Sequence, residues 1–133
     1  MGYTVFNDVT ARDLQRKHSQ WFRGKSLDTF SPMGPYLVTS DEIADPLDLE
    51  LEMKVNGESR QKANTGEMIF KIPEIVEVLS SGMTMEQGDI VATGTPSGVG
   101  SARGPEGLLK PGDLVEAWVE RIGSLRNRVV AEQ

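Results

Sequence analysis

Apolar and polar residues alternate strictly between positions 47 and 55, which is the clearest pattern in the chain. A side-chain period of two is typical of a β-strand with one buried face and one solvated face. Asn56-Gly57 follows, a dipeptide preferred in two-residue type I′ hairpin turns, so residues 58–62 are predicted to return as the partner strand. The pattern predicts that Glu50 and Glu52 are exposed and that the opposite face is buried, namely Leu49, Leu51, Met53 and Val55.

Short apolar runs elsewhere predict further strands, separated by turns rich in glycine and proline. Their expected ranges are 3–6, 36–38, 90–92, 114–121 and 125–130, and the strand at 90–92 is predicted to be buried. Apolar residues at helical spacing predict short helices at 11–18 and 73–80, the second beginning with a proline, which a helix start accepts. Residues 19–26 lack periodicity and are predicted to form a loop. The expected fold class is therefore mainly β with short helices (α+β).

Composition narrows the class of protein. The chain has 133 residues, so residues 1–133 correspond to a single domain or to part of one. A hydrophobic content of 38% argues against disorder, and no apolar run reaches the ~20 residues needed to span a membrane. The net charge of −6 argues against a nucleic-acid partner. The absence of cysteine excludes disulfides and thiolate chemistry and fits a cytoplasmic location.

Asp8 lies where a predicted strand gives way to a predicted helix. Thr10 and Asp13, just beyond it, have the spacing of a capping box at a helix start. Loops that join rigid elements often carry functional residues. A carboxylate at such a corner either only turns the chain or binds a hard cation such as Mg²⁺, Mn²⁺ or Ca²⁺. The residues alone leave both interpretations open.

A glycine-rich segment, 93–100, is the second candidate site. Its glycines let backbone N–H groups approach an anion, and a carboxylate is the expected guest because the signatures of phosphate and dinucleotide loops are missing. Glu50 and Glu52 share one strand face, but the alternation favours a solvated surface over a metal site. Trp21 and Phe22 are interpreted either as a plug of the domain or an interface, or as a lid over a pocket.

Four sequence blocks together resemble the fumarylacetoacetate hydrolase family. They are GYTVxNDVTARDxQ at 2–15, KSxDxFxPxGP at 25–35, VNGE at 55–58 and GDIxxTGTPxGVG at 88–100. The resemblance runs from the first residue to about Val119, and several of the blocks are specific in combination.

The resemblance implies a fold, an assembly and a metal site. Catalytic domains of this family form a mixed β-sandwich roll, usually in a homodimer, and hold Mg²⁺ or Mn²⁺ with three carboxylates. Asp8 matches the third of these metal ligands, whereas the other two belong to a Glu-x-Glu segment that precedes the GYT block in the family. Because this chain begins at that block, the resemblance predicts the C-terminal part of a catalytic domain, incomplete at its N-terminus and without a complete metal site of its own.

The resemblance also assigns substrate contacts. Gln15 and Lys25 match polar residues that contact the oxygens of the substrate, and Thr95 matches a hydroxyl that binds the substrate carboxylate. Arg12 belongs to the same block and is interpreted as structural support. Lys25 is also expected to be catalytic, because a fixed ammonium group stabilises negative charge that develops during the reaction.

The function implied by the resemblance is that of a metal-dependent hydrolase, isomerase or decarboxylase acting on a small 2-oxo or dicarboxylic acid. The resemblance is closer to a branch associated with aromatic catabolism, with fumarylpyruvate and acylpyruvate hydrolases, oxaloacetate decarboxylases and 2-hydroxyhepta-2,4-diene-1,7-dioate isomerases. These reactions share an enolate, which a divalent ion stabilises as a Lewis acid. The alternative is a non-catalytic homologue that serves as an interaction or structural module, since two metal ligands are missing from the sequence.

Overall fold

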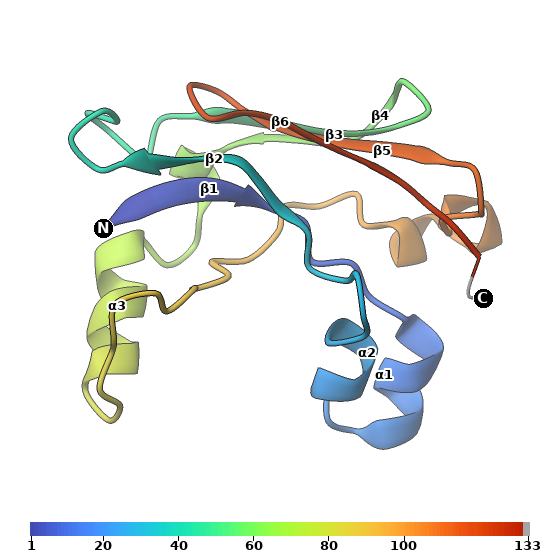
Figure 1. The fold of residues 1–133 in the computed structure, drawn as a ribbon, viewed down its shortest axis with the longest axis horizontal. Helices are drawn as coiled ribbons and strands as arrows, with labels where there is room; N and C mark the ends of the chain where they lie inside the picture. Colours follow the sequence, from blue (N-terminus) through green and yellow to red (C-terminus); the bar gives the residue numbers. More distant parts are fainter. Residues whose placement is uncertain (132–133) are drawn as a thin grey trace.

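A computed structural model describes residues 1–131 of the protein. Its strands gather at one side of the molecule, and the helices α1, α2 and α3 all lie at the other (Figure 1). This arrangement confirms the predicted fold class, mainly β with short helices. The elements in chain order are β1 (Gly2–Phe6), α1 (Arg12–His18), α2 (Phe22–Lys25), β2 (Met33–Thr39), β3 (Glu50–Val55), β4 (Glu58–Asn64), η1 (Thr65–Glu67), α3 (Ile72–Ser80), η2 (Gly100–Arg103), η3 (Pro105–Gly107), β5 (Leu114–Val119) and β6 (Gly123–Arg128).

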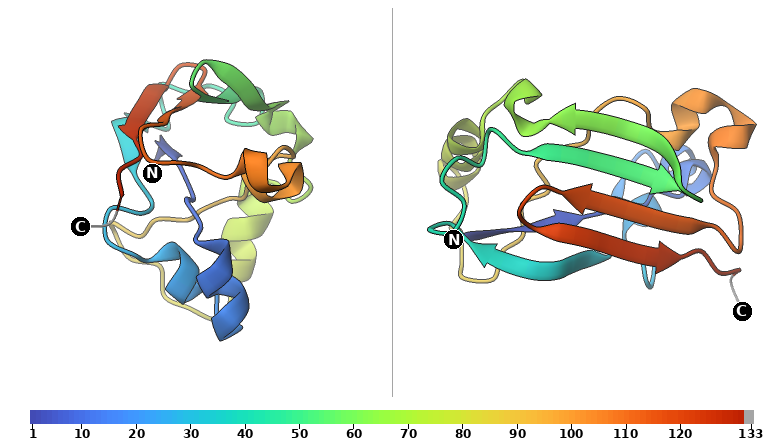
Figure 2. Two further views of the ribbon diagram at one scale, coloured as in Figure 1. Left: turned by 90° about the vertical axis from the view of Figure 1, so that its right-hand side faces the viewer. Right: turned by 90° about the horizontal axis from the view of Figure 1, so that it is seen from above.

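The strands form two antiparallel sheets within residues 1–131. One pairs β1 with β2, and the other is four-stranded, in the order β4-β3-β5-β6. The view from above shows the strands of the larger sheet lying side by side (Figure 2). In the larger sheet Leu51 pairs with Val119 and Met53 pairs with Ala117, so the apolar side chains of β3 and β5 share one face. We call the face that carries Met53 and Ala117 the inner face, since both belong to or pack against the core.

The β3–β4 hairpin has the predicted turn. Asn56 and Gly57 have φ angles of 52° and 83°, as both central residues of a type I′ turn require. The ladder is regular on both sides of a single register shift, because Lys54 pairs with Ser59 whereas Met53 pairs with Gln61. Arg60 is therefore the extra residue of a β-bulge in β4, a feature that the alternation of β3 did not predict.

The buried core lies between the two sheets and the segment that connects β2 with β3. Most of its buried apolar residues form one cluster, composed of Val5, Ile43, Leu49, Ala117 and Ile122, and Val115 is buried outside this cluster. Leu49 is 4% exposed, as predicted, although β3 begins one residue later. The other predicted inner residues, Leu51, Met53 and Val55, are only half-buried. On the opposite face Glu50 is exposed, as predicted. The predicted exposure of Glu52 is wrong, since its side chain is half-buried beside Lys54 and Ser59.

The predicted helices form, with two local differences. α1 and α3 correspond to the predicted ranges, and α3 has its proline in the first turn. The capping box of Thr10 and Asp13 is wrong: Ala11 caps α1 without a side-chain hydrogen bond, because the Thr10 hydroxyl bonds to Asp8 and Lys25 instead. The predicted loop at 19–26 contains a helical turn, α2, which packs against α1.

The predicted buried strand at 90–92 is wrong. Residues 90–92 have no strand structure, and the Ile90 side chain is 57% exposed. They belong to a long irregular segment that passes on the helical side of the sheet (Figure 1). An apolar run becomes a buried strand only when a neighbouring strand pairs with it, and within residues 1–131 none does. None of the described helices is long and apolar enough to cross a membrane.

Candidate active site

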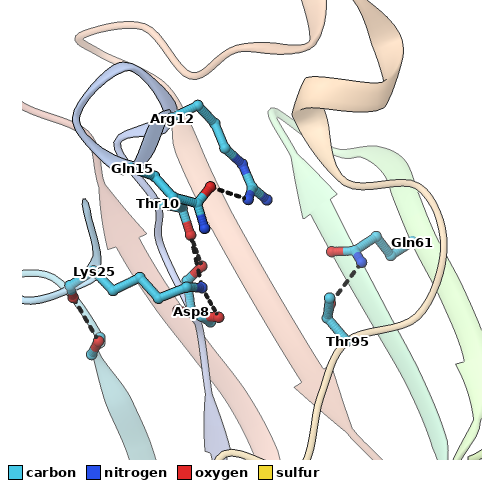
Figure 3. Close-up of polar contacts among 8 residues, drawn as sticks. Asp8, Thr10, Arg12, Gln15, Lys25, Gln61 and Thr95 are labelled. Atoms are coloured by element: carbon cyan, nitrogen blue, oxygen red, sulfur yellow. Dashed lines mark hydrogen bonds and ion pairs between the residues drawn. The ribbon is translucent and has the colours of Figure 1, made fainter. Parts of the chain in front are cut away.

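Asp8, Thr10 and Lys25 form a compact polar cluster at the end of β1. Lys25 Nζ donates hydrogen bonds to Asp8 Oδ2 and, at 3.2 Å, to Thr10 Oγ1 (Figure 3). The Thr10 hydroxyl in turn donates to the backbone carbonyl of Asp8 at 3.1 Å. The Lys25 and Asp8 side chains are 23% and 38% exposed, so the ion pair remains open to solutes. The cluster combines a held ammonium group with an accessible carboxylate.

The local fold explains how Lys25 reaches Asp8 across sixteen intervening residues. Gly24 is buried at the contact of α1 with α2, and its carbonyl accepts a hydrogen bond from Ala11 N at 2.8 Å. Lys25 follows as the last residue of α2, and its own carbonyl accepts a hydrogen bond from Ser31 Oγ at 3.3 Å. The packing of α1 against α2 therefore places Lys25 beside the residues that follow β1, among them Asp8.

Trp21 lies next to the cluster and is not part of the core formed by residues 1–131. The Lys25 ammonium is 6.0 Å from the centre of the Trp21 ring, within the range of a cation–π contact. Trp21 and Phe22 are 65% and 72% exposed, so neither fills the core formed by residues 1–131. The alternatives of an interface plug and a lid both stay predictions, and the position of Trp21 beside Lys25 suits a lid.

Gln15 and Arg12 form a second pair on α1. Arg12 Nη1 donates to Gln15 Oε1 at 2.9 Å, and the interpretation of Arg12 as a supporting residue stays a prediction. Because a guanidinium group only donates, the atom of Gln15 that faces it must be the amide oxygen. The NH₂ group of Gln15 then remains as a donor for an oxygen atom of a ligand.

Thr95 belongs to a separate group on the glycine-rich segment. Its hydroxyl accepts a hydrogen bond from Gln61 Nε2 at 2.9 Å, and the same nitrogen donates to Pro96 O at 2.8 Å. Figure 3 shows Thr95 and Gln61 apart from the group of Asp8, Lys25 and Gln15. The structure therefore joins Asp8 to Lys25 but brings Thr95 into direct contact with neither. The sequence blocks did not include Gln61, the inner-face partner of Thr95.

The described residues do not form a divalent-cation site by themselves. Within residues 1–131, no group of three or more histidine, cysteine, aspartate or glutamate side chains is arranged to hold a metal ion. Asp8 contributes a single accessible carboxylate. Glu52 pairs with Lys54 at 3.0 Å, and hydrogen bonds from Ser59 and Lys54 lower the pKa of its carboxyl group. Glu52 therefore takes part in an ion pair on the polar face of the sheet.

Similarity to known proteins identifies the protein family to which this chain belongs. The family model described as "Fumarylacetoacetate (FAA) hydrolase C-terminal" matches residues 1–130. The chain belongs to the fumarylacetoacetate hydrolase family, as its sequence blocks indicated.

Individual relatives cover almost all of this chain, but the chain covers only part of them. The oxaloacetate tautomerase YisK of Bacillus subtilis is 54% identical over 96% of this chain and 42% of its own length. The fumarylacetoacetate hydrolase structure from Exiguobacterium antarcticum is 50% identical, with a TM-score of 0.94, over 98% of this chain and 47% of that one. The 2-hydroxyhepta-2,4-diene-1,7-dioate isomerase structure from Mycobacterium marinum is 48% identical, with a TM-score of 0.85, over 97% of this chain and 47% of that one. The chain thus spans about half the length of these relatives.

Proposed function

We propose that the protein containing this chain is an enzyme that acts on a small 2-oxo acid through an enol or enolate form of the substrate. The observation that carries the proposal is the Lys25 ammonium group, held by Asp8 and Thr10 at an open position. The names of two relatives support the substrate class, since one is an oxaloacetate tautomerase and one is a 2-hydroxyhepta-2,4-diene-1,7-dioate isomerase. Tautomerisation and isomerisation of such acids both move a proton next to a keto or enol group.

Lys25 is proposed to hold the oxygen on which negative charge develops. An ammonium group has three N–H donors, and Asp8 and Thr10 occupy two of them. Among residues 1–131 the third donor has no further hydrogen-bond partner, so it can bind a substrate oxygen, and the group is already oriented before the substrate arrives. A pre-oriented donor stabilises the transition state without the reorganisation that water would require. The free NH₂ of Gln15 would contribute a second contact to a substrate oxygen.

Asp8 is proposed to be one ligand of a Mg²⁺ or Mn²⁺ ion in the complete protein. Its accessible carboxylate has the hard oxygen donors that these ions prefer. Family resemblance assigns the remaining carboxylates to a segment outside residues 1–131. When bound, the ion would act as a Lewis acid on the substrate. A homodimer is part of the same proposal; apolar side chains on β2 such as Leu37, which is 73% exposed, offer surface for an interface.

The experiment compares Asp8→Ala with Asp13→Ala in the full-length gene product. Both residues are exposed acids of one sequence block, but only Asp8 contacts Lys25. Turnover is followed with oxaloacetate, an acylpyruvate and fumarylpyruvate at a series of Mg²⁺ concentrations. Asp8→Ala is expected to lose Mg²⁺-dependent turnover, whereas Asp13→Ala keeps it. Full activity of Asp8→Ala would refute the metal assignment, and inactivity of the wild type on all three acids would favour a non-catalytic module.

A further inference from the structure

The glycine-rich segment, residues 93–100, is hydrogen-bonded to the Gln61 side chain of β4. Gln61 Nε2 donates to both Thr95 Oγ1 and Pro96 O, at 2.9 and 2.8 Å. Three residues further on, Gly98 lies so close to β4 that a Cβ atom there would overlap the carbonyl oxygen of Arg60. Arg103 Nη2 donates to that same carbonyl at 3.0 Å. Residues 95–103 therefore contact β4 at Gln61 and at the adjoining bulge.

The contact with Pro96 determines how the amide of Gln61 is oriented. A backbone carbonyl can only accept a hydrogen bond, so the side-chain atom that faces Pro96 O must be the nitrogen of the amide. The same nitrogen faces Thr95 Oγ1, so this hydroxyl oxygen is an acceptor toward Gln61. The hydroxyl proton of Thr95 consequently points elsewhere and is available for an outside acceptor. Thr95 is exposed, so an acceptor in solution can reach it.

We propose that Gln61 is a positioning residue that fixes the Thr95 hydroxyl as a hydrogen-bond donor toward a substrate carboxylate. This inference rests on the proposed function, action on a 2-oxo acid, and on the family resemblance, which assigns binding of the substrate carboxylate to Thr95. Without the Gln61 donor, Pro96 O would lack its partner and the Thr95 hydroxyl could turn to donate to it. The hydroxyl would then no longer present its proton to the substrate.

The central variant is Gln61→Met, which keeps the length of the side chain and removes its N–H donors. Loss of one neutral hydrogen bond in the bound state corresponds to a rise in KM of about three- to tenfold. The value of kcat should stay within about twofold, because a carboxylate contact is made equally in the ground and transition states. Gln87→Met, at an exposed glutamine outside residues 95–103, is the matched control and should leave KM unchanged.

A double-mutant cycle separates orientation of the hydroxyl from general support of the segment. In a Thr95→Val background, which has no hydroxyl to orient, Gln61→Met should raise KM by less than twofold further. In a Thr95→Ser background, which keeps the hydroxyl, the three- to tenfold effect should return. An undiminished effect of Gln61→Met in the Thr95→Val background would overturn the positioning role. If Gln61→Met does not fold, Gln61→Glu serves instead, since it has the same shape without N–H donors and is expected to raise KM at least as much.

Hydrogen exchange on the free protein makes failure of this inference distinguishable from failure of the proposed function. Gln61→Met should increase amide exchange in residues 95–100 and leave α3 as in the wild type, whatever the substrate is. Unchanged exchange in residues 95–100 would overturn the role of Gln61 even if the enzyme turns over a 2-oxo acid. Retained activity of Asp8→Ala would instead refute the proposed metal chemistry. The hydrogen-exchange measurement on Gln61→Met would still test the role of Gln61, because it does not depend on the substrate.

Discussion

Replacing Lys25 by methionine tests the central element of the proposed chemistry. Methionine keeps most of the apolar stem of lysine and removes the charge together with all three N–H donors. Two of those donors hold the ammonium against Asp8 and Thr10, and no other residue in the described part of the chain accepts from the third. The variant therefore removes the proposed contact to the substrate oxygen and leaves the path of α2 unchanged.

The expected loss in catalysis is much larger than the expected loss in stability. Removing one pre-oriented donor to a developing oxyanion lowers kcat by roughly 10²–10³, equivalent to ~2.7–4 kcal/mol of transition-state stabilisation. The Asp8–Lys25 pair, in contrast, is 38% and 23% exposed, and a partly exposed ion pair contributes less than about 1 kcal/mol to folding. The two quantities therefore separate a catalytic role from a structural one.

The assay measures kcat of the full-length protein at saturating oxaloacetate and Mg²⁺, together with urea unfolding of the same preparation. Lys17→Met, at an exposed lysine in the last turn of α1, is the matched control and should behave like the wild type in both measurements. If Lys25→Met retained kcat within threefold of the wild type, the charge-stabilising role would be refuted. If it lost several kcal/mol of stability, Lys25 would be a structural residue and the loss of activity would have another origin.

Two further predictions concern stability. Leu49→Ala should destabilise the protein by about 2–5 kcal/mol because Leu49 is 4% exposed in the core, whereas Glu50→Ala should stay within about 0.5 kcal/mol; equal shifts in denaturant titrations would contradict the core assignment. A hydrogen bond from the backbone N–H of Lys110 holds the pKa of Asp113 below its usual value, with a contribution from the Asn56 side chain. Asp113→Asn should therefore reduce the free energy of unfolding at pH 7, and the difference from wild type should shrink as the pH falls below about 4. A difference that grows toward low pH would contradict this linkage.

Features that depend on neighbouring residues were predictable from the sequence. The type I′ turn at Asn56-Gly57 requires positive φ at both positions, and this dipeptide adopts it readily. α3 likewise has its signals within one segment, with a proline in the first turn and Glu74 accepting a hydrogen bond from Lys71 N. Asp8 was a candidate from its place at a strand-to-helix corner, whereas Lys25 came from family resemblance, and the structure joins the two through α1 and α2.

Features that depend on distant partners were not predictable in the same way. The apolar run at 90–92 has the composition of a buried strand, but Ile90 is exposed because no strand of residues 1–131 pairs with it. Thr10 has the right spacing for a helix cap, but its hydroxyl can make a different contact once Lys25 lies beside it. In both places the tertiary partner decides between structures that the local sequence allows equally.

The role of Gln61 shows how strongly one inserted residue can change a site. A regular hairpin around Asn56-Gly57 would pair Glu52 with Gln61, which would direct Gln61 to the polar outer face of the sheet. The bulge at Arg60 shifts the register by one residue, so Gln61 pairs with Met53 and faces inward. Only on that face can its amide reach Thr95 and Pro96. Bulges are frequent next to active sites because they redirect a side chain in this way. The orientation of the Thr95 hydroxyl thus depends on the register of a strand more than thirty residues earlier.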